Sequence, residues 1–284
     1  MDFSLKNKET ETMKIGVITD CFQTNHFDGI ETAAGLGLNG VQIYATTGEF
    51  SPETLTCEQK TAYKNLLKEK NMVISALCGD MGGYGFEIEA DNADRIEKTK
   101  KIIDLAVEFG AKVVTTHIGV IPADKTNPRY KVMLDALTAC GIYAKEKGVT
   151  MAIETGPEKA ATLLAFLEDT KGGVGVNLDP ANFTMVTEQD AVEAVYILKD
   201  YIVHTHAKDG RKLRPGVPAA AVYHGTEQGV YADLPLGEGD VNWDAYLAAL
   251  KDVGYDGFLT IEREAGNDRV GDMTRAAAFL KAKL

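Results

Sequence analysis

The chain has 284 residues, of which 45% are hydrophobic and 25% are charged, a composition typical of a folded globular protein and not of a disordered one. Acidic residues outnumber basic residues by 42 to 30, and the net charge of -12 disfavours a nucleic-acid partner. The four cysteines form no CxxC pair, and no run of residues is apolar enough for a membrane span or a signal peptide, so we expect a cytoplasmic protein with no membrane partner.

From Lys14 onward, short β-rich runs alternate with longer segments of helical period, a pattern typical of a parallel sheet crossed by helices. Residues 1–12 are polar and are expected to form a flexible leader before a single domain, residues 13–284. The predicted strands cover residues 14–19, 40–44, 72–77, 112–117, 149–154, 174–179, 201–206 and 257–262. The predicted helices cover residues 27–38, 52–70, 91–109, 128–147, 158–170, 188–200, 242–253 and 271–283. Eight such units predict an α/β fold, the (β/α)8 TIM barrel.

The connection after the seventh predicted strand is unusually long. It covers residues 207–241 and is rich in Gly, Pro and Ala. A loop of this length at the catalytic end of a barrel usually covers or shapes the active site. We therefore expect this segment to contribute to substrate specificity.

Four acidic or imidazole side chains end the last four predicted strands. They are Glu154 in MAIE, Asp179 in VGVNLD, His206 in YIVHTH and Glu262 in FLTIE. Successive members are 25, 27 and 56 residues apart, close to one, one and two strand-helix repeats. Because the carboxyl ends of barrel strands meet at one rim, we expect these four side chains to form one metal site.

The alternation of residues along each strand supports a shared direction for these side chains, since alternate residues of a barrel strand face the interior. If Glu154 faces inward, Ile153 packs against the helices. The same alternation places His206 and His204 inside the barrel and Val203 outside it. Polar residues are thus predicted to face the interior of the barrel and apolar ones to face the helices.

Three carboxylates and one imidazole form an oxygen-rich set that suits one divalent ion, Mn²⁺ first, with Mg²⁺ or Co²⁺ as alternatives. Octahedral geometry leaves two positions for the carbonyl and adjacent hydroxyl of a carbohydrate substrate, and the metal would stabilise an enediolate. Proton transfer between the two carbons needs an acid and a base that bracket the substrate. Glu154 and Glu262 are the candidates because the strands of the other two ligands separate theirs.

The runs AIETGP, VNLDPANF, VHTHAKDG, PLGEGDVNW and GYDGFLTIERE resemble the xylose isomerase-like TIM barrel family, which includes sugar phosphate isomerases and epimerases. The resemblance extends from the first strand to the last helix. It implies metal ligands at Glu154, Asp179, His206 and Glu262, acid/base roles for the two glutamates, and a dimer or tetramer. The DNA-repair branch of this superfamily is disfavoured, since it uses many histidines to hold three zinc ions, whereas this chain has only five and Asn182 stands in place of one of the required ligands.

Candidate substrate-binding residues lie beside these ligands. His117 ends the fourth strand and faces inward, and Lys208 follows the ligand histidine, where it could polarise a substrate oxygen or form an ordinary ion pair. Asn182 stands where ketose 3-epimerases have a substrate-contacting histidine. Arg211 is an offset counterpart of an arginine that follows their ligand histidine. These two departures weaken a prediction of free-ketose 3-epimerisation.

Three functions remain open at this stage. The first is a metal-dependent isomerase or epimerase of a sugar, keto-sugar or cyclitol. The second uses the same site to expel a group, as a dehydratase or lyase acting on a keto-sugar, an inosose or a keto-glycoside. The third is a sugar-binding barrel without catalysis. The mass of the product distinguishes the first from the second, and metal dependence distinguishes both from the third.

Overall fold

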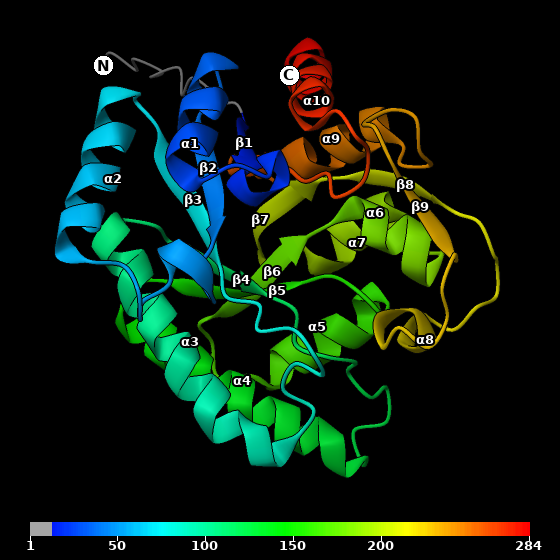
Figure 1. Ribbon diagram of the computed structural model, residues 1–284. Helices are drawn as coiled ribbons and strands as arrows, with labels where there is room; N and C mark the ends of the chain where they lie inside the picture. The colour runs from blue at the N-terminus through cyan, green and yellow to red at the C-terminus, as the bar shows by residue number, and fades with distance from the viewer. Residues whose placement is uncertain (1–12) are drawn as a thin grey trace, which may run out of the picture.

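The computed structural model describes residues 13–284, which form a closed barrel of eight parallel strands surrounded by helices (Figure 1). Neighbouring strands follow the order β1-β2-β3-β4-β5-β6-β7-β10, and β10 pairs with β1. The strands are β1 (Lys14–Ile18), β2 (Gly40–Tyr44), β3 (Val73–Cys78), β4 (Val113–Thr116), β5 (Thr150–Glu154), β6 (Val174–Leu178), β7 (Ile202–Ala207) and β10 (Phe258–Ile261). The predicted TIM barrel is confirmed. The predicted leader, residues 1–12, lies outside the described residues.

Each predicted helix is present within a few residues of its expected bounds. The long helices are α1 (His26–Gly35), α2 (Cys57–Glu69), α3 (Glu89–Phe109), α4 (Pro128–Glu146), α5 (Ala160–Asp169), α7 (Ala191–Leu198), α9 (Trp243–Asp252) and α10 (Arg269–Lys283). Helix α2 begins later than predicted because a 3-10 turn, η2 (Gly48–Phe50), precedes it and Thr56 forms a capping box with Gln59. Within residues 13–284, no helix is both long and apolar enough to cross a membrane.

Shorter helices lie at the carboxyl end of the barrel, where the loops carry functional groups. They are η1 (Thr19–Phe22) after β1 and α6 (Pro180–Asn182), which continues into the π-helical turn η3 (Phe183–Thr187). Asp179 caps α6 by accepting from the backbone N–H groups of Ala181 and Asn182 through Oδ1. This cap fixes the Asp179 carboxylate at the rim and leaves its second oxygen free to face the barrel axis.

The segment between β7 and β10 is folded and is not an open loop. Strands β8 (Asp209–Lys212) and β9 (Tyr231–Leu234) form an antiparallel pair, and α8 (Ala219–Tyr223) lies between them in the chain. Figure 1 shows the pair at the edge of the barrel, with α8 set apart from it. We call residues 213–230, which connect β8 to β9, the strap. No periodic pattern in residues 207–241 predicted this pair.

Asp209 organises the base of this insert. Its Oδ1 accepts from the backbone N–H groups of Gly210 (2.8 Å) and Val241 (3.2 Å). Its Oδ2 accepts from the N–H of Gly237 and from Trp243 Nε1, each at 2.8 Å. Asp209 is fully buried, so these four donors replace the water that a carboxylate otherwise requires. The carboxylate thereby holds both ends of the insert against the barrel.

One predicted side-chain direction in β7 is wrong. The ladder between β6 and β7 skips Val203, which is left as a β-bulge. A bulge adds one residue to the strand and so breaks the strict alternation from which the prediction was made. Val203 therefore packs inside the barrel and not against the helices, in contact with an apolar layer formed by Ala76, Val113 and Ala152. Above the bulge, His204 and His206 contact other interior residues, as predicted.

Candidate metal centre

The four strand-end residues converge at the carboxyl end of the barrel. One ligand atom from each of Glu154, Asp179, His206 and Glu262 can be chosen so that all lie within 4.8 Å of one another, and all four residues are buried. His206 Nδ1 is 3.2 Å from Glu154 Oε1 and 2.7 Å from Glu262 Oε2. The imidazole thus stands between the two glutamates. The predicted convergence is present, and metal binding by this cluster stays a prediction.

A buried chain of polar groups orients the His206 ring. His206 Nε2 lies 3.1 Å from Gln42 Oε1, and Gln42 Nε2 donates to Thr115 Oγ1 at 3.2 Å. Because an amide oxygen only accepts, the His206 ring donates to Gln42 from Nε2, and Nδ1 is the nitrogen that faces the carboxylates. Contacts of this kind set which imidazole nitrogen binds a metal. Gln42 on β2 therefore holds the His206 ring of β7 from across the barrel.

His204 lies one layer below the ligand histidine. Its Nδ1 is 2.9 Å from Asn177 Oδ1, and its Nε2 is 2.9 Å from Thr260 Oγ1. The Asn177 amide nitrogen also lies 3.1 Å from His206 Nε2. Burial and the neighbouring His206 keep the pKa of His204 well below its usual value, so this imidazole is neutral. His204 belongs to the support of the site and not to its ligand cluster.

The cluster contains a buried carboxylate oxygen that a cation would satisfy. Burial raises the pKa of Asp179 to about 7, with Glu262 and Glu154 adding to the shift against the opposing charges of Lys208 and His206. Asp179 Oδ2 is buried and has no hydrogen-bond partner. Burial opposes a charge on His206, yet Glu154 and Glu262 raise its pKa well above the usual value. An orphaned carboxylate oxygen among three acids fits a hard divalent ion, so the residues suit the group that the sequence predicts.

Lys208 reaches the edge of this cluster. Its Nζ is 2.6 Å from Glu262 Oε1 and 3.3 Å from Glu264 Oε2, and the lysine is buried. Burial would raise the pKa of Glu262, but Lys208 and His206 outweigh that effect and lower it. Lys208 therefore keeps Glu262 ionised. An ion pair is one of the two roles predicted for Lys208 from the sequence. The other, contact between Lys208 and a substrate oxygen, stays a prediction.

His117 lies on the other side of Glu154. His117 Nε2 is 3.7 Å from Glu154 Oε1, and His117 Nδ1 is 3.0 Å from Asp80 Oδ2. Burial opposes the charge of this imidazole, but Glu154, Asp80 and Glu262 together raise its pKa to about 9. In the absence of a bound ion, His117 is thus protonated at neutral pH. The side chain remains 28% exposed, so a ligand can reach it.

The two remaining predicted substrate contacts are placed differently. Asn182 follows the Asp179 turn, and its Nδ2 donates to the backbone carbonyl of Thr155 at 2.8 Å. Arg211 is on β8, where its half-exposed side chain pairs with Asp240 at 2.8 Å. Asn182 is therefore at the rim beside a ligand, whereas Arg211 is not brought into the cluster. Substrate binding by either residue stays a prediction.

Sequence reasoning missed two polar residues that support this site. Gln42 is the only polar side chain in the strand GVQIY, and it is buried. The sequence signal that could have identified it is a single amide at an interior-facing position of an otherwise apolar strand. Asp80 follows β3 within two residues and pairs with His117. Like the candidate ligands, it lies at or just past the end of a strand. Its distance in sequence from those residues was not used to identify it as a site residue.

The mouth of the barrel opens on two hollows. One, of about 560 Å³, lies beside Glu262 and is lined by Asp20, His26 and Tyr44 among others. The second, of about 900 Å³, extends from Tyr44 and Asp80 toward the start of α3. The ligand cluster and its neighbours thus have adjacent space for a small molecule.

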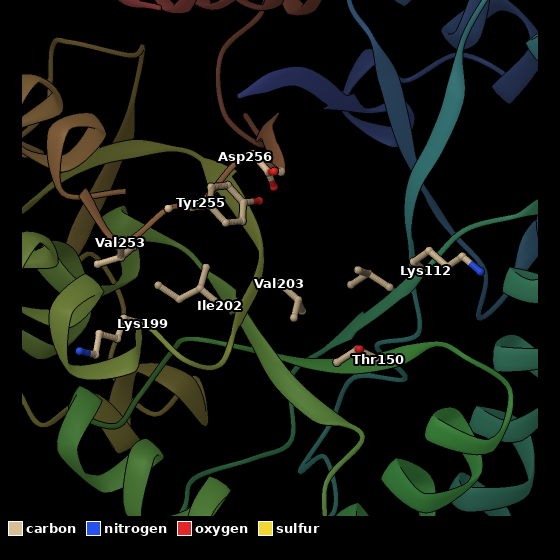
Figure 2. A pocket seen from close by; sticks show the side chains of 11 residues that line it. Lys112, Thr150, Lys199, Ile202, Val203, Val253, Tyr255 and Asp256 are labelled. Atoms are coloured by element: carbon tan, nitrogen blue, oxygen red, sulfur yellow. The ribbon is translucent and has the colours of Figure 1, made fainter. Parts of the chain in front are cut away.

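A third pocket, of about 370 Å³, lies at the opposite end of the barrel (Figure 2). It is lined by the starts of β4, β5 and β7 and by the turn before β10, including Thr150, Val203 and Tyr255. Figure 2 shows Lys112 and Lys199 on opposite sides of this pocket, so no pair of charged groups converges in it. The amino-terminal ends of barrel strands serve stability, and this pocket offers no catalytic constellation.

Comparisons with known proteins agree with this architecture. The model of the xylose isomerase-like TIM barrel family matches residues 30–283. The L-ribulose-5-phosphate 3-epimerase UlaE of Escherichia coli K12 is 23% identical over 270 residues, which cover 90% of this chain and 88% of that protein. The crystal structure of a xylose isomerase domain protein from Planctomyces limnophilus superposes with a TM-score of 0.78 at 26% identity, covering 95% of this chain and 96% of the other. The probable 3-DHS dehydratase AsbF of Bacillus anthracis shares the fold, with a TM-score of 0.76 at 21% identity over 95% and 99% of the two chains.

Proposed function

Since the chain belongs to the xylose isomerase-like TIM barrel family, we propose that it is a divalent-metal-dependent isomerase or epimerase of a sugar, keto-sugar or cyclitol. The observation that carries the proposal is the placement of His206 Nδ1 between Glu154 and Glu262, at 3.2 and 2.7 Å, with Asp179 in the same buried cluster. Proton transfer at a carbon beside a carbonyl requires an acid and a base next to a metal-bound substrate, and the carboxylates of Glu154 and Glu262 in this cluster would form that pair. The epimerase activity of the related UlaE supports this class of reaction.

Glu154, Asp179, His206 and Glu262 would hold the ion, Mn²⁺ first. When bound, the ion polarises a substrate carbonyl and the hydroxyl beside it. Glu262 is in the form that accepts a proton, because Lys208 Nζ at 2.6 Å and His206 lower the pKa of its carboxyl group. Glu154 has a different neighbour, since its Oε1 lies 3.7 Å from His117 Nε2. The two glutamates of the proposed acid/base pair thus have distinct partners.

A dehydratase or lyase is the second candidate, and one observation favours it. Expulsion of a hydroxyl or glycosyl oxygen needs a general acid beyond the base, and the His117 imidazole, 3.7 Å from Glu154, is placed to supply one. In this scheme Glu262 removes the proton next to the carbonyl and His117 protonates the leaving oxygen. The same residues would thus support elimination on a substrate whose leaving group faces His117.

The experiment is a screen of ketoses and inososes in deuterated water with the Mn²⁺-loaded protein. We expect products that are isomers of the substrate and carry one deuterium at the carbon beside the carbonyl, and loss of exchange on chelation. A product lighter by water or by a sugar unit would select the second candidate. Exchange that continued in the fully demetallated protein would contradict both.

A further inference from the structure

The strap crosses from the β7–β10 side of the barrel to the loops after β3 and β4, where its tip is anchored. His224, which follows α8, places Nε2 3.0 Å from Glu87 Oε1. The Tyr84 ring packs against the His224 ring at 5.1 Å between centroids, and the Tyr223 ring faces His117 at 6.0 Å. The strap therefore touches the barrel mouth at its tip, on the side where His117 lies.

The anchor itself is held in place by the barrel. Glu87 is 4% exposed at its side chain, accepts from the backbone N–H of Val120 at 2.7 Å, and pairs with Arg129 at 2.7 Å. A carboxylate bound on two sides by the barrel presents its remaining hydrogen-bonding capacity to His224 in a fixed direction. The position of Tyr223, one residue before His224, is thus set by the barrel and not by the strap alone.

Tyr223 faces the candidate site. Its ring is next to His117, which stands 3.7 Å from the ligand Glu154, so a substrate bound at the cluster and extending past His117 meets this ring. Burial and the nearby carboxyl groups of Asp80 and Glu87 raise the pKa of Tyr223, so the phenol stays protonated and able to donate. An aromatic ring with a hydroxyl tip suits the carbon chain and hydroxyls of a sugar.

We propose that Tyr223 forms the wall of the substrate site on the His117 side and contacts the part of a ketose that lies beyond its carbonyl end. The proposal rests on the proposed function for the kind of ligand, but not on the reaction that follows binding. A four-carbon ketose bound through its carbonyl end is too short to need this wall, whereas five-carbon and six-carbon ketoses extend to it. Tyr223 therefore determines which chain length the site favours.

Calorimetric binding of D-erythrulose, L-ribulose and D-allulose to the Mn²⁺-loaded protein tests this wall. We expect Tyr223→Ala to weaken the five-carbon and six-carbon ketoses about five- to tenfold and to leave D-erythrulose unchanged, since an aromatic contact of ordinary strength is lost. Tyr223→Phe, which keeps the ring and the fold, should recover most of that loss. Tyr231→Ala, on β9 of the same insert and 44% exposed, is the matched control and should bind all three ketoses as the wild type does.

Several results would overturn the proposal: no ketose bound by the wild type, an equal loss for all three ketoses in Tyr223→Ala, or no difference between Tyr223→Ala and the Tyr231 control. His224→Leu supplies a second test, because loss of the Glu87 contact should weaken the two longer ketoses and increase deuterium uptake by residues 213–230. Unchanged uptake would refute the anchor. If ketose binding depends on Tyr223 but no exchange occurs at the substrate carbon, the role of Tyr223 is supported and the isomerase is refuted. If exchange occurs but binding does not depend on Tyr223, the isomerase is supported and the role of Tyr223 is refuted.

Discussion

Replacement of Gln42 by Leu should weaken metal binding without touching any ligand. The Gln42 amide joins His206 Nε2 at 3.1 Å to Thr115 Oγ1 at 3.2 Å inside the barrel. Leucine has similar size but leaves His206 Nε2 and Thr115 Oγ1 without this partner and removes one of the contacts that orient the imidazole. Removal of such a partner typically lowers metal affinity by about 10- to 100-fold, or roughly 1.4 to 2.7 kcal/mol. The two unpaired groups add a loss of roughly 1 to 3 kcal/mol in the free energy of unfolding.

Calorimetric titration of Mn²⁺ into the metal-free proteins measures the affinity, and urea unfolding measures the stability. Gln189→Leu is the matched control, because Gln189 accepts from the backbone N–H of Ala160 at 2.9 Å away from the cluster. We expect the control to lose stability and to keep its Mn²⁺ affinity. An unchanged affinity in Gln42→Leu, or an equal loss in both variants, would refute the role given to Gln42.

Three further outcomes are expected. Glu154→Gln and Glu262→Gln should each lower deuterium exchange at the substrate carbon by about 10²- to 10⁴-fold, and exchange at the wild-type rate would contradict the acid/base pair. Burial raises the pKa of Glu158 to about 8, so the folded protein favours its neutral form and stability falls as pH rises from the unfolded pKa, about 4.3, to about 8. Urea unfolding should show the stability of Glu158→Gln gaining on the wild type by roughly 4 kcal/mol between pH 5 and pH 9, and a gap independent of pH would refute this. Asp209→Ala should lose about 3 kcal/mol in the free energy of unfolding, because it orphans four donors, and an unaltered melting temperature would contradict that role.

The periodic parts of the molecule could be predicted from the sequence. Each barrel strand is a short β-rich run with a helix of 3.6 period behind it, and both patterns depend only on local residue order. The ligand cluster followed from the same pattern, because Glu154, Asp179, His206 and Glu262 end strands whose carboxyl ends meet at one rim. Local order thus determined the elements, and the closed topology brought the ligands together.

The features that could not be predicted depend on contacts between distant segments. The bulge at Val203 arises from the register between β6 and β7, which strand alternation alone does not encode. Gln42 supports His206 from 164 residues away in the chain. The β8–β9 pair depends on the buried Asp209 carboxylate, whose donors Gly237 and Trp243 come from the far end of the insert. In each case the physical cause is a tertiary contact between segments that are far apart in the chain.

Crystals soaked in Mn²⁺ and measured at an anomalous wavelength test metal binding by the four-residue cluster. We expect one anomalous peak per chain, in contact with Nδ1 of His206 and with a carboxylate oxygen of each of Glu154, Asp179 and Glu262. The orphaned Oδ2 of Asp179 should supply that residue's ligand atom. The absence of a peak there, or a peak held by other side chains, would contradict a metal site at these residues.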